Sequence, residues 1–205
     1  MRRLLIISKP VNYSLSDVLP IIGVDRKTHV IIVSPGSQST SGFRDSIDSE
    51  LGIARAAKTV ADAVNSQAFH KITFALTDAD PLTATTIFAL YIAFNTIESF
   101  TNIYVEPLKL VYNGEVLEFA PRMRLCIDRR DILLLKAVER CADSERISGI
   151  AQLPSSSTRR RLLKLYRNGF VEVDRLGRRY LYCPTQLSQM FREIADIVAV
   201  GASSI

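Results

Sequence analysis

The sequence predicts an α/β protein of two domains: a mostly parallel sheet flanked by helices over residues 1–120, and a mainly helical domain over residues 121–205. In the first domain, short and fully apolar runs alternate with helical patterns, which is typical of parallel strands joined by helices. In the second, three helical patterns precede two short strand patterns. The charge divides at the same place, because residues 1–120 carry 10 Lys and Arg against 12 Asp and Glu, whereas residues 121–205 carry 16 against 9. Such a split indicates two domains with different partners.

The first domain is predicted to be Rossmann-like, with its central strands buried on both faces. We expect strands over residues 4–8, 29–34, 71–76 and 102–106, and helices over residues 53–64 and 82–99. Asp80 followed by Pro81 is typical of a helix start, because Asp accepts hydrogen bonds from free amides and Pro fits the first turn. Asn113-Gly114 between apolar flanks predicts a type I′ hairpin at the end of this domain.

Polar residues follow several of these strands at their carboxyl ends, where parallel sheets bind ligands. Hydroxyls and backbone amides there suit the phosphate or ribose oxygens of a nucleotide. The candidate ligand-binding residues are Ser8, Lys9, Ser34, Gly36, Ser37, Gln38, Thr77, Thr83 and Thr85. The sequence contains no GxGxxG or GxxxxGK[ST] pattern, so we expect no nicotinamide or ATP site and no cofactor. The alternative of ordinary polar loops stays open.

The stretch IFALYIAF, residues 87–94, lies within the second of the predicted helices and is apolar nearly all round. A helix of that kind must be covered on every side. Either a second subunit covers one face, or the helix is unusually central in its own domain. We expect the first of these, a homodimer.

The second domain is predicted from helix caps and strand patterns. We expect helices over residues 128–141, from Asp143 or Ser144 through residues 147–151, from SSSTRRR to Arg167 and from Thr185 onward, with strands over residues 170–174 and 179–183. One of Ser155, Ser156 and Ser157 is expected to cap the third helix. Leu162, Leu163 and Tyr166 are expected to face the core, and Asn168-Gly169 is expected to end the helix.

This order of elements, with a basic hairpin tip, is typical of a winged helix-turn-helix domain, whose third helix enters the major groove of DNA. The candidate DNA-binding residues are Ser155, Ser156, Ser157, Thr158, Arg159, Arg160, Arg161, Lys164, Arg175, Arg178 and Arg179. Arg159 and Arg160 are the expected base readers, and the hydroxyls suit phosphate contacts. We expect a homodimer on a pseudo-palindromic site in double-stranded DNA. A winged helix used only for protein contacts is the alternative.

An α/β domain with the strands LLIIS, HVIIVS and KITFAL in that order, followed by a winged helix, resembles the CRISPR-associated transcriptional regulators. Those proteins pair an N-terminal CRISPR-associated Rossmann-fold (CARF) domain with a C-terminal winged helix. The resemblance implies a dimeric regulator of CRISPR-associated genes in antiviral defence, with cyclic oligoadenylate as the ligand. The family's loop after the third strand reads Thr-Gly-Gly-Thr and then a basic residue, where this chain has LTDADPLTATT. The resemblance carries over Thr77, with Thr83 or Thr85 in place of the second threonine.

Two other interpretations stay open: a regulator that responds to an unrelated small molecule, and a CARF protein with weak ring-nuclease activity. Some CARF proteins carry a ribonuclease domain marked by an Arg, four to six residues and then a His. Neither His29 nor His70 has that spacing, so we expect both to be structural and the protein not to be an enzyme.

Cys126, Cys141 and Cys183 are few, odd in number and widely spaced, so the sequence predicts neither a disulfide framework nor a zinc site. That usage suits a reducing compartment. The apolar run after Met1 is too short for a signal peptide, and residues 87–94 are far too short to span a membrane. We expect a cytoplasmic protein with no membrane partner.

Overall fold

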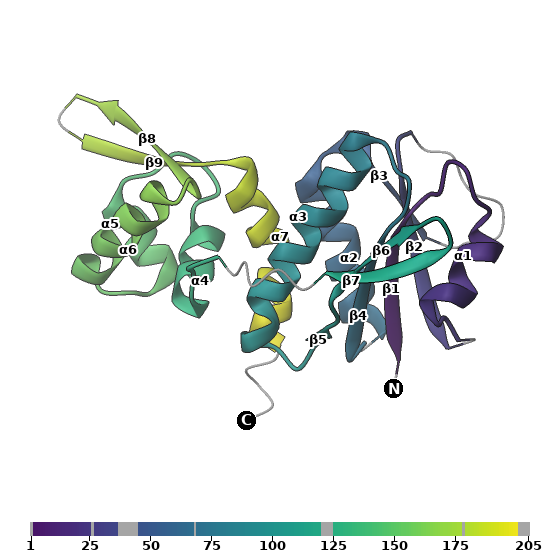
Figure 1. Ribbon diagram of the computed structural model, residues 1–205. Helices are drawn as coiled ribbons and strands as arrows, with labels where there is room; N and C mark the ends of the chain where they lie inside the picture. The colour runs from purple at the N-terminus through teal and green to yellow at the C-terminus, as the bar shows by residue number, and fades with distance from the viewer. Residues whose placement is uncertain are drawn as a thin grey trace. The chain divides into compact units, whose positions relative to one another are not determined.

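The computed structural model describes residues 2–25, 27–36, 45–67, 69–119, 125–177 and 179–200 (Figure 1). Contacts within the chain divide it into two units, residues 1–125 and residues 126–205. The sequence predicts a boundary after residue 120, five residues before this division. Residues 120–124 lie outside the described residues.

Unit 1 (residues 1–125) is built around a sheet in which seven strands are described. The strands are β1 (Arg3–Ser8), β2 (Thr28–Ser34), β3 (Asp45–Asp48), β4 (Lys71–Leu76), β5 (Tyr104–Val105), β6 (Leu108–Tyr112) and β7 (Glu115–Phe119). Their order across the sheet is β3-β2-β1-β4-β6-β7, with β5 beside β4, and every pairing is parallel except that of β6 with β7. The predicted α/β architecture with a mostly parallel sheet is confirmed. Strand β3 was not predicted, because DSID contains no apolar run.

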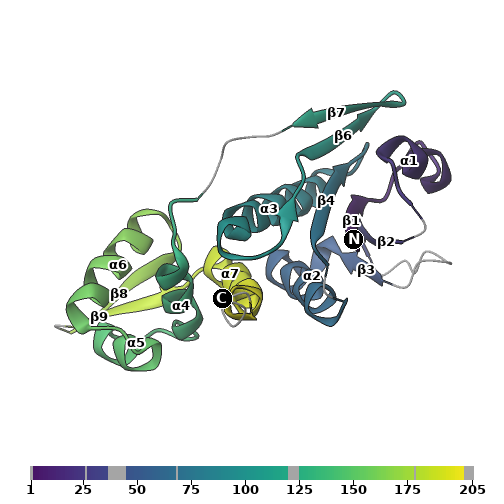
Figure 2. The same cartoon turned by 90° about the horizontal axis from the view of Figure 1, so that it is seen from below.

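Helices cover both faces of this sheet (Figures 1 and 2). Helix α1 (Leu15–Ile22) lies on one face, and helices α2 (Ile53–Gln67) and α3 (Pro81–Ile97) lie on the other. Leu5 of β1 packs with Val18 of α1, whereas Phe74 of β4 contacts Tyr91 and Phe94 of α3 at ring-centroid distances of 5.8 and 5.9 Å. The central strands are therefore apolar on both sides because both sides are covered.

Helix α3 begins where the sequence predicts. The Asp80 carboxylate accepts hydrogen bonds from the amides of Leu82 and Thr83, each at 3.0 Å, and Pro81 is the first helical residue. The four successive residues 91–94 are all buried, and burial raises the pKa of Tyr91. The helix is thus covered nearly all round, as its composition indicates, while the homodimer stays a prediction.

The hairpin between β6 and β7 also follows its sequence signal. Asn113 and Gly114 have φ angles of 50° and 78°, and both belong to the left-handed region that a type I′ turn needs. Tyr112 pairs with Glu115 across the turn, so the register leaves a two-residue loop. This prediction is confirmed.

A charged network lies at the amino-terminal ends of β1 and β4. The Glu106 carboxylate is paired with Arg3 and Lys71, each at 2.7 Å, and also accepts a hydrogen bond from the Thr73 hydroxyl. The guanidinium of Arg3 further donates to the carbonyl of Gly23, next to the end of α1, at 2.8 Å. Burial opposes ionisation of Glu106, but the hydrogen bonds from Lys71 and Thr73 and the charge of Arg3 outweigh it and hold the pKa of Glu106 below its usual value. The network joins β1, β4 and the end of α1.

Unit 2 (residues 126–205) is mainly helical, with one antiparallel pair of strands in its described part. Its elements are α4 (Arg129–Ala137), α5 (Ser144–Ala151), α6 (Ser155–Arg167), β8 (Val171–Leu176), β9 (Arg179–Pro184) and α7 (Gln186–Val200). Asp143 caps α5 through the amides of Glu145 and Arg146, and Gly169, at a φ of 73°, follows the end of α6, as the sequence predicts. Helix α4 ends at Ala137 rather than at residue 141, because the chain leaves the helical conformation at Val138.

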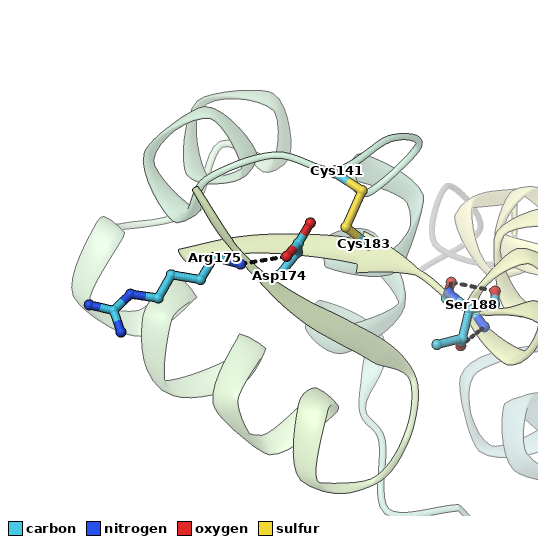
Figure 3. The surroundings of a disulfide bond; sticks show 6 residues. Cys141, Asp174, Arg175, Cys183 and Ser188 are labelled. Carbon is cyan, nitrogen blue, oxygen red and sulfur yellow. Dashed lines mark hydrogen bonds between the residues drawn. A yellow bond between two sulfur atoms is a disulfide. The ribbon is translucent and has the colours of Figure 1, made fainter. Parts of the chain in front are cut away.

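The segment between α4 and α5 pairs with β9. Ala142 and Tyr182 exchange two backbone hydrogen bonds, of 3.1 and 2.8 Å, so Ala142 stands beside β9 as an added bridge. A disulfide joins the neighbouring residues, Cys141 and Cys183 (Figure 3). The prediction that the cysteines form no disulfide is wrong, because the bridge brings together two cysteines that are 42 residues apart in the chain. Cys126 is a free, exposed cysteine.

The core of unit 2 lies among its helices. Leu134 of α4 and Leu162 and Leu165 of α6 are fully buried, and Phe170 stacks edge-on against Phe191 of α7 at 5.6 Å. Leu162 faces the core as predicted, whereas Leu163 and Tyr166, also predicted to face it, are exposed.

The network at Glu106 predicts a pH-dependent contribution to stability. Glu106→Gln leaves Arg3 and Lys71 without their carboxylate, which should lower the free energy of unfolding by about 1–3 kcal/mol at pH 7. Because the pKa of Glu106 is lowered by folding, this stabilisation is present above about pH 4.3, the usual pKa of Glu, and is lost as the pH falls through the lower pKa of the folded state.

Urea unfolding of the wild type and Glu106→Gln, followed by circular dichroism from pH 3 to pH 7, measures this difference. The two curves should converge in acid. A difference that stays constant across the range would contradict the role given to the Glu106 carboxylate.

Candidate functional site

Helix α6 buries one face and presents the opposite one at the surface of unit 2. Thr158, Leu162 and Leu165 follow one another at four- and three-residue spacing and are fully buried. Arg159 and Arg160 lie between them on the other side and are exposed. Residues three and four apart share a helix face, so the two expected base readers both point outward. The sequence also predicts a DNA contact from Thr158, but its buried side chain does not reach the surface.

The start of α6 differs from its prediction. Pro154 is the N-cap residue, with a φ of −58°, and no side chain caps the helix. Ser155 is the first helical residue, and its hydroxyl lies 3.3 Å from that of Ser148 in α5. The prediction that one of three serines caps the helix is wrong, because the proline fixes the turn one residue earlier. Ser155 and Ser156 are exposed and Ser157 is half-buried.

Two further cations of the sequence motif point inward to α4. Arg161 forms ion pairs of 2.7 Å with both Asp128 and Asp131, and Lys164 pairs with Asp131 at 2.7 Å. Asp131 is fully buried, whereas the side chains of Arg161 and Lys164 are 17% and 41% exposed. These two residues, predicted to bind DNA, therefore hold α6 against α4.

The same carboxylates also cap α4. Asp128 accepts the amide of Asp131 at 3.0 Å, and Asp131 accepts the amide of Asp128 at 3.1 Å, which together form a capping box. Burial raises the pKa of Asp128, but the hydrogen bonds from Arg161 and the Asp131 amide outweigh it and lower the pKa below its usual value. The pKa of Arg161 is raised by its hydrogen bond to Asp128, which outweighs the opposing effect of burial. We name Asp128, Asp131, Arg161 and Lys164 the α4–α6 charge cluster.

A groove runs between the outward face of α6, the start of α5 and strand β9. Its volume is about 570 Å³. Its lining residues are Asp143, Ser144, Glu145, Arg159, Leu163, Arg179, Tyr180 and Tyr182. The groove brings Arg159 of α6 and Arg179 of the hairpin, both predicted to bind DNA, to one surface.

Both groove arginines have acidic neighbours from the start of α5. Arg159 donates to the Ser144 hydroxyl at 3.3 Å and pairs with Glu145 at 3.4 Å, while Arg179 lies 4.0 Å from Asp143. The side chains of Arg159 and Glu145 are 62% and 76% exposed. Exposed pairs of this kind are weak, so a phosphate or a base can replace the carboxylate as the partner of either arginine.

Two apolar side chains on α6 lie opposite to their predicted direction. Leu163 and Tyr166 are 43% and 48% exposed, although the sequence predicts them in the core. The signal that identifies the true inward face is the spacing of Thr158, Leu162 and Leu165, which sequence reasoning missed because Thr158 is polar. The outward face of α6 is therefore part cationic and part apolar.

The hairpin of β8 and β9 carries the remaining predicted cations. Arg175 is exposed, and its guanidinium donates at 3.1 Å to the carbonyl of Gly177 in the turn between β8 and β9. Figure 3 shows the side chain of Arg175 extending away from the disulfide. Arg179 is exposed as well, whereas Arg178 lies outside the described residues.

In unit 1, the predicted ligand site is at the carboxyl ends of β1 and β4, where the strand order reverses. The hydroxyls of Ser8 and Thr77 lie 2.8 Å apart there, and the Thr77 amide donates to Ser8 at 2.8 Å. Both side chains are buried. These two hydroxyls, both predicted to bind the ligand, bind each other instead.

The other ligand-binding candidates are similarly engaged. Thr83 lies 3.0 Å from the Ser49 hydroxyl, and Thr85 donates to the carbonyl of Pro81 at 2.7 Å. Ser34 and Thr83 are buried, whereas Thr85 is exposed.

At the same edge, the Gly36 amide donates to Asp48 at 3.0 Å, and the Lys9 amide donates to the carbonyl of Val33 at 2.9 Å. Ser37 and Gln38 lie outside the described residues.

Carboxylates are prominent at this same edge of the sheet. Asp78 accepts the amides of Val11 and Asn12, at 3.1 and 2.8 Å, while Asp80 caps α3. Together with Asp48, these carboxylates repel phosphate at this edge. The described part of unit 1 therefore offers less to an anionic ligand than its sequence indicates.

The described residues hold no group of three or more His, Cys, Asp and Glu placed to bind a metal ion. Within the same residues, no helix has the length and hydropathy needed to cross a membrane. Comparison of the chain with protein-family models and with curated proteins gives no match.

The α4–α6 charge cluster predicts a large effect of one buried carboxylate on stability. Asp131→Ala leaves Lys164 without its carboxylate and Arg161 with Asp128 alone, which should lower the free energy of unfolding by about 1–3 kcal/mol. Urea unfolding followed by circular dichroism measures it. Asp174→Ala, which removes an exposed carboxylate of β8, serves as the control and should stay within about 0.5 kcal/mol of wild type. Equal effects of the two changes would show that the cluster does not hold α6.

Proposed function

We propose that unit 2 is a winged helix-turn-helix domain that binds double-stranded DNA, and that the protein is a transcriptional regulator. The observation that carries this proposal is the groove, because it brings Arg159 of α6 and Arg179 of the β8–β9 hairpin to one surface. A domain that reads DNA through a helix and a hairpin needs cations on both elements, on the same side.

The order of elements in unit 2 supports the proposal. Helix α4, the Ala142 bridge, α5, α6 and the β8–β9 pair follow one another as the helices and strands of a winged helix do. In that arrangement α6 is the helix that enters the major groove. The hairpin then reaches the flanking backbone.

The proposal assigns different tasks to the cations of α6. Arg159 and Arg160 face outward and read base edges, where arginine pairs best with guanine. Leu163, also outward, provides apolar contact for the methyl group of thymine. Arg161 and Lys164 position the helix through the α4–α6 charge cluster and do not contact DNA.

For unit 1 we propose ligand sensing and dimerisation, so that two copies of α6 read the two halves of a pseudo-palindromic site. The resemblance to CARF regulators supports CRISPR-associated genes as the target and cyclic oligoadenylate as the ligand. Because Ser8 and Thr77 are buried against each other, backbone amides rather than these hydroxyls would contact it. The acidic side chains of Asp78 and Asp80 favour the alternative, an unrelated ligand that is not anionic.

Fluorescence anisotropy with the DNA upstream of the protein's own gene, at fixed salt, tests the DNA-binding function. Arg159→Ala and Arg160→Ala should each weaken binding by about 5- to 150-fold, the loss of one base contact of about 1–3 kcal/mol. Arg130→Ala removes another exposed charge, on α4, and should change the affinity less than about twofold.

A shuffled duplex of the same length and composition provides the reference for specificity. If the wild type binds both duplexes equally, the regulator proposal fails. If Arg130→Ala weakens binding as much as Arg159→Ala, the outward face of α6 is not the reading surface.

A further inference from the structure

The disulfide of unit 2 fixes the hairpin to the segment that precedes α5. Cys141 belongs to that segment and Cys183 to β9, and between them the chain forms α5, α6 and β8 (Figure 3). Beside the disulfide, Ala142 and Tyr182 exchange two backbone hydrogen bonds, and Arg179 lies 4.0 Å from Asp143. The cross-link therefore reinforces the attachment of the strand that carries Arg179.

Cys141 is accessible from solvent. The residue is exposed and lines a second groove, of about 400 Å³, whereas Cys183 is half-buried. Among the described residues that line this groove, Lys136, Arg140 and Arg146 are cationic and Glu139 is acidic. A thiolate that approaches Cys141 is an anion, so it meets a net positive field there.

We propose that Cys141–Cys183 is a thiol–disulfide exchange site that a small dithiol opens in the folded protein. One thiolate of the dithiol attacks the sulfur of Cys141, which forms a mixed disulfide and releases Cys183 as a thiolate that takes up a proton. The second thiol of the reagent, as its thiolate, then attacks the mixed disulfide and releases Cys141. Two electrons pass to the protein, both cysteines end as thiols, and the dithiol ends as its own disulfide.

Opening the bond weakens the attachment of β9. The hairpin is then held to the α4–α5 segment, without a covalent link, by the Ala142–Tyr182 hydrogen bonds and the exposed pair of Arg179 with Asp143. Arg175 and Arg179 belong to this hairpin, so the redox state controls how firmly they are positioned. This last consequence for DNA rests on the proposed function, whereas the exchange reaction does not.

The test uses the full chain with Cys126→Ser, which removes the free exposed cysteine. The folded protein is incubated with dithiothreitol without denaturant, quenched in acid and labelled with a maleimide for counting by mass spectrometry. We expect no labelled thiol before reduction and two after it. We also expect amide exchange of the peptide that contains Tyr182 to accelerate by about tenfold on reduction.

The effect of the groove's positive charge on reduction is tested by the double variant Arg140→Gln/Arg146→Gln, made in the chain that carries Cys126→Ser. The rate of reduction should fall by about three- to tenfold, because two charges near the attacked sulfur are lost. An unchanged rate overturns the role of these arginines.

Labelled thiols before reduction would show that Cys141 and Cys183 are not joined. Thiols that appear on reduction only in urea would show that the bond is not open to exchange in the folded protein. Either result overturns the proposed exchange site. No DNA is used in these measurements, so their outcome is independent of the DNA-binding proposal. For that proposal, the reduced protein should bind the upstream duplex more weakly than the oxidised one, and equal affinities overturn the control of the hairpin.

Discussion

The buried carboxylate of Asp131 is the constraint on which the arrangement of unit 2 depends. A fully buried charge is costly unless it is paired and hydrogen-bonded, and Asp131 meets this need through Arg161, Lys164 and the amide of Asp128. Two of these partners come from α6, so the helix can rotate only by breaking them. Leu162 and Leu165 are buried in the same orientation. The orientation of α6 about its axis decides which side chains of SSSTRRR face outward. Arg159 is one of those that do.

Unit 1 shows the same principle with the opposite consequence for function. Its polar groups at the sheet edge satisfy one another, as Ser8 does with Thr77 and Ser49 with Thr83. Polar groups that are buried must find partners, and here the partners are protein groups rather than a ligand. In unit 2, by contrast, Arg159 has exposed and weakly held acidic neighbours. The polar groups of unit 1 are thus already paired, whereas Arg159 of unit 2 can exchange its partner. This difference favours unit 2 as the unit that binds another molecule.

The parts of the structure that sequence predicts well are those set by local signals. Asp80-Pro81 begins α3 and Asn113-Gly114 forms the hairpin turn, because in each case the residues themselves favour the backbone conformation. The misses depend on residues far apart in the chain. Cys141 meets Cys183 only through a bridge made by the folded hairpin, and the inward direction of Arg161 depends on an aspartate 30 residues earlier.

The most direct test of the account asks which face of unit 2 touches DNA. Leu163 on α6 and Leu133 on α4 are almost equally exposed, at 43% and 41%, so a photo-crosslinking benzophenone side chain can replace either one under matched conditions. Irradiation of each variant with the upstream duplex, followed by gel analysis of labelled DNA, compares the two faces. We predict that the crosslink forms from position 163 and not from position 133. A crosslink from position 133 alone, or equal yields from both, would contradict the orientation of α6 as the reading helix.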